Sequence, residues 1–154
     1  MKTNKKQHMG YCAICGKYTN LSFEHIPPED ALNNNCSKMY SIGEMIKKSK
    51  GEKARYTQQQ RGTGKHSLCD KCNNNTGSWY VPAYNLIAKA TAWVLQNREP
   101  LKHGDVLAFS TESFEPLAFV KQVITMFCST IPLEQVQRLG FDRYILEKEN
   151  NKEL

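Results

Sequence analysis

The sequence has no long hydrophobic run. A helix that crosses a bilayer needs about 18 or more consecutive apolar residues, whereas the longest apolar pieces of this chain are interrupted by Lys89 or Lys121. We therefore expect no membrane span. No apolar run follows the basic segment 1–10 either, so we expect no signal peptide and a chain that stays in the reducing cytoplasm.

The composition also lacks the biases that accompany disorder. Hydrophobic residues make up 40% of the 154 residues and charged residues 23%, which is ordinary for a globular protein. A chain of this length suits one domain, or a small core with an extension. No internal repeat is evident apart from two similar cysteine pairs.

Acidic residues are scarce relative to basic ones. Lysine and arginine total 21 and aspartate and glutamate 15, a net charge of +6 with a sequence pI near 9.0. The imbalance is greatest between positions 47 and 65, where one acid, Glu52, accompanies a set of seven basic residues: Lys47, Lys48, Lys50, Lys53, Arg55, Arg61 and Lys65. This segment is either a solvated loop or a surface for a polyanion, with nucleic acid favoured over an acidic membrane.

Four of the six cysteines form two Cys-x-x-Cys pairs, Cys12 with Cys15 and Cys69 with Cys72. Each pair has the spacing of two ligands of a tetrahedral zinc ion, and two pairs complete a four-cysteine site. The segment 16–68 is longer than the gap of a simple zinc ribbon, so another element must lie within it. A redox role is the weaker interpretation because neither pair has a thioredoxin-like strand–helix pattern around it.

The other two cysteines receive no chemical role. Cys128 falls in an apolar helical pattern and is expected in the core, while Cys36 lies in a polar segment.

Strand signals are confined to the first half of the chain. Tyr18, Leu21, Phe23 and Ile26 form a run with β propensity, which two prolines end. The polar segment 29–64 is expected to be a long loop with one short helix at about 41–48. A further short apolar run at 106–110 is a possible strand.

The second half is expected to be helical. One helix is predicted from Pro82 to Arg98 and a second from Pro116. A third is predicted from Pro132 to Gly140, where glycine gives a left-handed stop. The apolar side chains of the second helix are expected on a single face, namely Leu117, Val120, Ile124, Phe127, Cys128 and Ile131.

This pattern indicates an α+β fold. Residues 10–80 form a zinc-bearing core with a basic insertion, residues 81–146 form a helical extension packed on it, and residues 1–9 and 147–154 are flexible tails. A single zinc ion that joins the two cysteine pairs would bring the end of the first strand close to the start of the following helix.

Three polar side chains meet under that arrangement. Histidine can be neutral near pH 7, as a general base must be, so His25 is the candidate base. Glu24 and Asn73 offer the hard oxygen ligands that Mg²⁺ or Mn²⁺ prefers. Each also has a structural alternative: a packed histidine, an exposed strand-end acid and a helix-capping asparagine.

At this point the sequence resembles the zinc-bearing branch of the HNH endonucleases, which have a ββα-metal core. The matching motifs cover roughly residues 10–80 and stand in the family's order: Cys12 and Cys15, then Glu24-His25-Ile26-Pro27, then Leu68-Cys69, Cys72 and Asn73. The run from Cys72 to Gly77 is similar to the Cys-Asn-x-x-x-Gly ending of one bacterial and phage sub-branch.

The resemblance implies hydrolysis of phosphodiester bonds. His25 would activate a water molecule, one Mg²⁺ or Mn²⁺ ion would be held through Glu24 and Asn73, and the four cysteines would hold a structural zinc ion apart from the chemistry. The basic segment would contact the nucleic-acid backbone largely independently of sequence, with DNA favoured over RNA.

Two positions depart from the family pattern. Asn73 follows the last cysteine, where most active zinc-bearing members have histidine, and Gly64 stands where the middle asparagine of the family usually lies. His66 is a candidate to replace that asparagine, or is simply a loop residue.

Three functions therefore remain open. The first is a metal-dependent HNH-type DNA endonuclease. The second is a zinc-stabilised nucleic-acid-binding module without catalysis, which the two departures favour. The third is an adaptor whose C-terminal helices bind a protein partner, which exposed apolar surface on those helices would favour.

Overall fold

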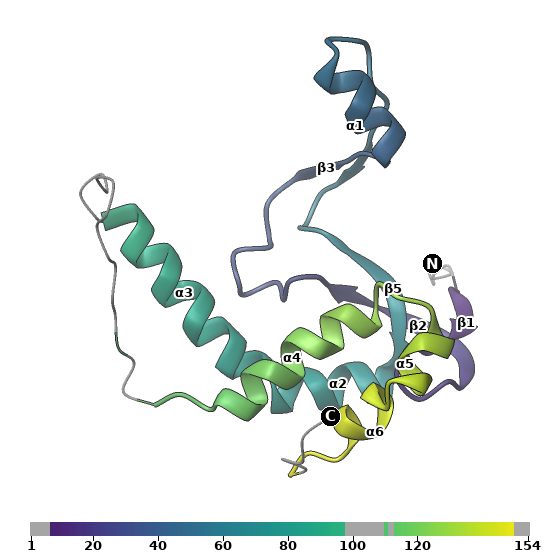
Figure 1. Ribbon diagram of the computed structural model, residues 1–154, viewed down its shortest axis with the longest axis vertical. Coiled ribbons are helices and arrows are strands. Elements are labelled where there is room, and N and C mark those ends of the chain that lie inside the picture. The colour runs from purple at the N-terminus through teal and green to yellow at the C-terminus, as the bar shows by residue number, and fades with distance from the viewer. Residues whose placement is uncertain (1–6, 98–109, 111–112, 150–154) are drawn as a thin grey trace, which may run out of the picture.

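The computed structural model describes residues 7–97, 110 and 113–149, and these form an α+β fold with small sheets and several helices, as predicted. Figure 1 shows several helices gathered beside the sheet and a narrow arm, which carries a further helix, projecting from the sheet. The predicted strand at 106–110 and the end of the predicted helix at Arg98 fall on positions outside the described residues, apart from Ser110.

A three-stranded antiparallel sheet, among the described residues, has the order β1-β2-β5. Its strands are β1 (Met9–Tyr11), β2 (Tyr18–His25) and β5 (Gly64–Cys69). β2 is the predicted strand, and it ends where proline follows because proline has no N–H to continue the ladder. The register of β2 and β5 shifts between Ser22 and Phe23, and this irregularity leaves Ser67 as the extra residue of a bulge.

The segment between β2 and β5 is more ordered than the loop expected from its polar sequence. β3 (Ser37–Met39) and β4 (Thr57–Gln59) pair as a two-stranded antiparallel ribbon, and α1 (Ile42–Ser49) joins them. The predicted short helix is therefore present, and Ser41 caps it by accepting a hydrogen bond from the Glu44 N–H at 3.3 Å. The ribbon was not predicted, because strand pairing satisfies polar backbone groups without requiring apolar side chains.

Helices follow the sheet in chain order. α2 (Asp70–Trp79) starts directly after β5, with the Cys69 sulfur at its N-cap. It is followed by α3 (Val81–Asn97), α4 (Pro116–Cys128), α5 (Leu133–Arg138) and α6 (Phe141–Leu146). Gly140 has a φ of 71°, the left-handed conformation expected of a helix stop, and the chain then enters α6, which was not predicted.

The predicted apolar face of α4 is confirmed at Ile124 and Cys128, which are buried, and wrong at Val120 and Phe127. Val120 and Phe127 are 44% and 57% exposed, while the buried positions include Lys121, Gln122 and Thr125. These polar side chains can be buried because most find partners: Thr125 Oγ1 donates to the Lys121 carbonyl at 2.8 Å, and Lys121 Nζ donates to the carbonyl oxygens of residues 147 and 148.

One hydrophobic core joins the sheet to the C-terminal helices. Its buried side chains come from both halves of the chain: Cys12, Ile14, Leu68, Cys72, Tyr80, Ala118, Ile124, Cys128, Val136 and Ile145. Tyr80 extends this connection by donating its hydroxyl to the Ile145 carbonyl at 2.6 Å. Cys128 is fully buried, as predicted for a core cysteine.

Candidate metal centre and active site

The two cysteine pairs come together, as their spacing predicted. The sulfur atoms of Cys12, Cys15, Cys69 and Cys72 all lie within 4.8 Å of one another, and those of Cys15 and Cys69 are 3.8 Å apart. The first pair lies in a tight turn closed by a 2.9 Å hydrogen bond from the Gly16 N–H to the Cys12 carbonyl. The second pair spans the cap and first turn of α2. This cluster can hold a structural metal ion such as zinc.

Within the cluster, the surroundings of Cys12 favour thiolate, the form that binds zinc, whereas burial raises the pKa of Cys15. A hydrogen bond from Cys72, together with backbone hydrogen bonds from Cys69, Cys15 and Ile14, lowers the pKa of the Cys12 thiol to about 4. The hydrogen bond to Cys12 and burial raise the pKa of Cys72. A second thiolate beside Cys12 therefore requires a compensating positive charge, which a zinc ion would supply.

Beyond the cysteines, β2, the turn that follows it and the helices α2, α3 and α4 line a cavity of about 240 Å³. It is lined by Phe23, Glu24, His25, Pro28, Glu29, Asp30, Asn73, Thr76, Gly77, Val81 and Gln122. The three residues predicted to meet, His25, Glu24 and Asn73, are all among them. Along the chain, β2, β5 and α2 stand in the order strand, strand, helix, which is the order that the family resemblance implies. Family membership itself stays a prediction.

Asn73 ties α2 to β2. Its side-chain amide nitrogen donates to Ser22 Oγ at 3.1 Å and to the Phe23 carbonyl at 3.3 Å. An amide that uses its nitrogen in this way is held in one orientation. The side chain thus has a structural role, and its carbonyl oxygen takes no part in these two bonds.

His25 lies at the end of β2, between two cavities. It lines the first cavity and a second one of about 390 Å³, formed with Phe23, Glu29, Gln59, Gln60, Arg61 and Gly62. Its Nε2 atom is 2.9 Å from the backbone carbonyl oxygen of Arg61. Because a carbonyl can only accept, Nε2 must carry the hydrogen, and a neutral His25 ring then has its lone pair on Nδ1.

Glu24 is buried, with 6% of its surface exposed, although an acid at a strand end is usually exposed. Ser67 donates to its Oε2 atom at 3.2 Å, and Ser129, from the end of α4, donates to the same oxygen. Burial raises the pKa of Glu24 to about 7, against the lowering effect of the two serines. The other carboxylate oxygen, Oε1, takes no part in these bonds.

Gln122 is a candidate site residue that sequence reasoning missed. It comes from α4, is 2% exposed, and lines the cavity with Glu24 and Asn73. Its Oε1 atom is buried and has no hydrogen-bond partner among the described residues. Such an atom is costly to bury unless something binds to it. The only signal in the sequence was a glutamine within an apolar helix. Recognising it as a site residue requires the buried face of that helix to be predicted correctly.

Glu29 and Asp30 also line the cavity and were not predicted. They follow Pro28 in the turn after β2, where nothing in the sequence distinguished them from loop acids. Together with Glu24 they place three carboxyl groups around one cavity.

His66 lies elsewhere on the sheet. Its ring stacks on that of His8, with centroids 3.5 Å apart, and packs edge-on against Phe23 at 5.3 Å. His8 is half-buried. Among the described residues, the lining of the two cavities beside His25 does not include His66.

Gly64 cannot be replaced by a larger residue without movement of the backbone. It pairs with His25 across the two strands, and a Cβ atom at this position would lie 2.2 Å from the Glu24 carbonyl oxygen and 2.8 Å from the Phe23 ring. The close approach of β2 therefore favours glycine at position 64.

Asn33 holds the segment after β2 against the segment before β5. Its amide nitrogen donates to the carbonyls of Pro27 and Thr63, and its side-chain oxygen accepts from the Thr63 N–H at 2.7 Å. Gly62, between Arg61 and Thr63, has a φ of 75°. These hydrogen bonds hold the backbone segment that contains Arg61, whose carbonyl oxygen contacts the His25 ring.

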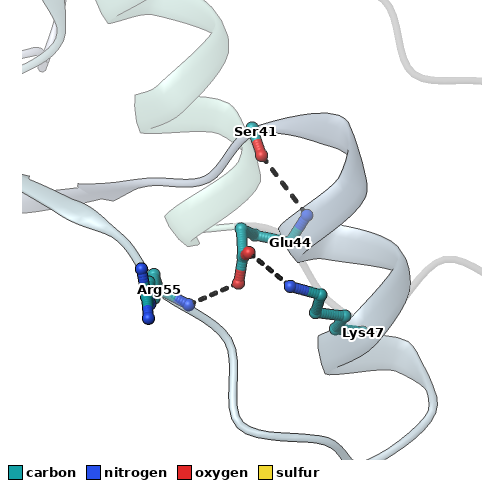
Figure 2. Close-up of polar contacts among 4 residues, drawn as sticks. All are labelled: Ser41, Glu44, Lys47 and Arg55. Carbon is teal, nitrogen blue, oxygen red and sulfur yellow. Dashed lines mark hydrogen bonds and ion pairs between the residues drawn. The ribbon is translucent and has the colours of Figure 1, made fainter.

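The seven predicted nucleic-acid-binding residues are all exposed and lie on two separate stretches of the chain. Five of them, Lys47, Lys48, Lys50, Lys53 and Arg55, belong to α1 and the segment after it, whereas Arg61 lies between β4 and β5 and Lys65 lies on β5. Lys47 donates to Glu44 Oε1 at 2.7 Å, and Arg61 lies 4.0 Å from Glu29. Figure 2 shows Ser41, Lys47 and the Arg55 backbone gathered around Glu44.

The geometry so far defines an α+β protein with a four-cysteine cluster suited to a structural metal ion, next to a polar cavity. Comparisons with protein-family models, curated proteins and solved structures found no match. Within the part of the chain that the structure describes, no helix is both long and apolar enough to cross a membrane.

Proposed function

We propose that this protein is a metal-dependent HNH-type endonuclease that hydrolyses phosphodiester bonds of DNA. The observation that carries the proposal is His25, whose Nε2 is engaged by the Arg61 carbonyl at the edge of a cavity lined by oxygen-bearing side chains. The order of the motifs along the chain supports it.

The oxygen donors of the cavity fit a hard divalent cation. Glu24, Asn73 and Gln122 would hold Mg²⁺ or Mn²⁺, since such ions prefer carboxylate and amide oxygens. Gln122 Oε1 has no partner among the described residues, and the two serines use only one oxygen of Glu24. When bound, the cation would neutralise negative charge on the phosphate and the leaving oxygen.

The residues of the chain would do the remaining chemistry. His25 Nδ1 accepts a proton from water, the water oxygen forms a bond to phosphorus, and the bond from phosphorus to the leaving sugar oxygen breaks. The leaving oxygen is protonated by solvent. The Arg61 carbonyl keeps the ring in the required tautomer and stabilises the imidazolium that forms.

The test is incubation of supercoiled plasmid with the full chain, with Mg²⁺ or Mn²⁺ and with EDTA. We expect metal-dependent nicking that His25→Ala abolishes while His8→Ala, the matched histidine control, retains it. Circular dichroism checks that both variants are folded. Equal inactivity of the wild type and His25→Ala with every metal would contradict the proposal.

A second candidate is a nucleic-acid-binding module without catalysis. The nitrogen of Asn73 is committed to β2 and Glu24 is buried, and both facts suit structural roles. This candidate predicts DNA binding that needs neither Mg²⁺ nor His25. An adaptor role rests on α3, where Trp93 and Leu95 are 67% and 52% exposed, and it predicts neither DNA binding nor cleavage.

A further inference from the structure

The arm, defined as residues 37–59, is built from β3, α1 and β4. Figure 1 shows α1 at its far end, away from the other helices. No residue of α1 (42–49) is buried. The arm therefore adds little to the stability of the core.

The helix at the end of the arm, α1, turns its apolar face to solvent and its polar face toward the rest of the arm, which is the reverse of the usual amphipathic helix. With 3.6 residues per turn, Ile42, Met45 and Ile46 share one face and Glu44 lies on the other. The Glu44 face is turned inward, because its Oε2 atom accepts the Arg55 N–H at 2.6 Å (Figure 2). The apolar face is turned to solvent, and Ile42, Met45 and Ile46 are 79%, 58% and 51% exposed.

We call Ile42, Met45 and Ile46 the apolar stripe. A contiguous exposed apolar surface on a small protein indicates a binding site. Lys47 and Lys48 follow directly in the sequence. Viewed down the helix axis, each lies on one side of Glu44, between Glu44 and an edge of the stripe, and thus borders the stripe. Any partner must accept both apolar contact and positive charge.

Charge on the arm favours a polyanion. The arm carries two acids, Glu44 and Glu52, and six basic residues: Lys38, Lys47, Lys48, Lys50, Lys53 and Arg55. Glu44 already receives the Lys47 ammonium and the Arg55 N–H. Lys48 lies over the Tyr40 ring at 4.5 Å, and Lys38 lies over the Tyr56 ring at 4.6 Å.

The base of the arm is continuous with the candidate site. β4 ends at Gln59, whose side-chain amide bonds both the N–H and the carbonyl of Gly64 at 3.1 Å. Gln59, Gln60 and Arg61 then line the second cavity with His25. A polyanion that reaches His25 can therefore continue along the arm.

We propose that the arm grips duplex DNA beside the cleaved phosphate, with the apolar stripe seated in the minor groove and the bordering basic side chains on the phosphates. This inference rests on the proposed function for the choice of DNA. Apolar side chains such as isoleucine and methionine enter base steps from the minor groove and bend the duplex, while lysine and arginine supply salt-dependent affinity. An anionic membrane is less suited, because the stripe covers less than two helical turns and the arm starts at the candidate site.

The experiment uses the full chain carrying His25→Ala, so that binding is measured without cleavage. A fluorescent duplex of about 30 base pairs, roughly three helical turns, is titrated by anisotropy at several salt concentrations. Energy transfer between dyes on its two ends reports bending. Vesicles of phosphatidylserine and phosphatidylcholine provide the membrane arm of the test.

Two sets of substitutions separate the apolar and charged contributions. We expect Ile42→Ser with Met45→Ser to weaken DNA binding on the order of tenfold, to remove the bend, and to leave the salt dependence unchanged. The matched control, Leu95→Ser with Leu139→Ser, replaces side chains that are 52% and 50% exposed elsewhere and should bind as the parent. Lys47→Gln with Lys50→Gln should lower the salt slope by roughly 0.9 for each lost phosphate contact.

The outcomes are distinct. Unchanged DNA affinity and unchanged bending after substitution of the stripe would overturn the proposal. It would also be overturned if binding to anionic vesicles depended on the stripe and binding to DNA did not depend on it. Absence of DNA binding by the parent would also overturn it. Stripe-dependent DNA binding without plasmid cleavage by the wild type would support the arm and contradict the nuclease, so the two proposals can fail separately.

Discussion

Ser129, at the end of α4, donates a hydrogen bond to the carboxylate of Glu24 on β2, across 105 positions of the sequence. Both residues are buried, with 1% and 6% of their surfaces exposed. The C-terminal helices therefore help to build the cavity beside His25, and they hold an acid in the protein interior.

That acid should make stability depend on pH. Burial raises the folded-state pKa of Glu24 to about 7 from an ordinary 4.5, so the folded protein binds more protons than the unfolded chain between these values. Stability must then fall as pH rises through this interval. We expect a loss of about 2 kcal/mol between about pH 5.5 and 8, measured by urea unfolding.

Replacing the acid should remove this dependence. Glu24→Gln should flatten the stability profile, whereas Glu134→Gln, at an exposed position, should leave it unchanged. Stability that rises with pH in the wild type would show that Glu24 is ionised in the folded protein.

Removal of metal should unfold the cysteine-rich half. We expect about one zinc ion per chain and loss of far-ultraviolet circular dichroism with a strong chelator, because structural zinc contributes roughly 10 kcal/mol or more to the folding of small sites. Cys69→Ser should lose zinc. Cys36→Ser is the control, since Cys36 is exposed and lies outside the four-cysteine cluster. Zinc retained in full by Cys69→Ser would contradict the site.

Gly62 should be intolerant of any side chain. A Cβ atom there would lie 1.8 Å from the Asn33 carbonyl oxygen, and φ is 75°. We expect Gly62→Ala to cost about 3–5 kcal/mol of unfolding free energy and to impair plasmid nicking, because the backbone beneath His25 would move.

Gly51 offers a matched control for this substitution. Its φ is 78°, but apart from its own backbone and its two chain neighbours no atom lies within 4 Å of the added Cβ position. Gly51→Ala should therefore cost only about 1–2 kcal/mol, for the left-handed backbone alone. Equal losses in the two variants would show that the Asn33 contact is not the cause.

Gln122 should contribute to binding of the divalent cation. Gln122→Met removes a buried oxygen without a partner among the described residues, so stability should stay the same or rise. Affinity for Mn²⁺, measured by the electron paramagnetic resonance of the free ion, should fall about tenfold. Gln135→Met, on the exposed side of α5, is the control. Unchanged Mn²⁺ affinity with altered stability would assign Gln122 a purely structural role.

Local patterns in the sequence predicted much of the fold. The Cys-x-x-Cys spacings predicted that Cys12 and Cys72 would come together, and the prolines after Ile26 predicted the end of β2. Pro116 and Gly140 likewise marked the start of α4 and the end of α5. These signals succeed because each depends on a few neighbouring residues, through ligand spacing, a missing N–H or a left-handed φ.

Other features were decided by contacts between distant parts of the chain. The apolar pattern of α4 indicated a face containing Val120 and Phe127, but tertiary packing buried Lys121 and Gln122 because remote carbonyls and aromatic rings could surround the lysine. The polar segment 29–64 gave no sign of pairing, since a ribbon uses backbone hydrogen bonds that any sequence can offer.

The sequence alone predicted the α+β class, the clustering of the four cysteines and the placement of His25, Glu24 and Asn73 beside one another. Contacts between distant segments were needed to show that Ser129 bonds Glu24, that Gln122 lines the same cavity as Glu24, that Glu24 is buried, and that the apolar stripe of α1 faces solvent. The reason is physical: spacing and periodicity are properties of neighbouring residues, whereas burial and partnership depend on where chain segments far apart in the sequence meet.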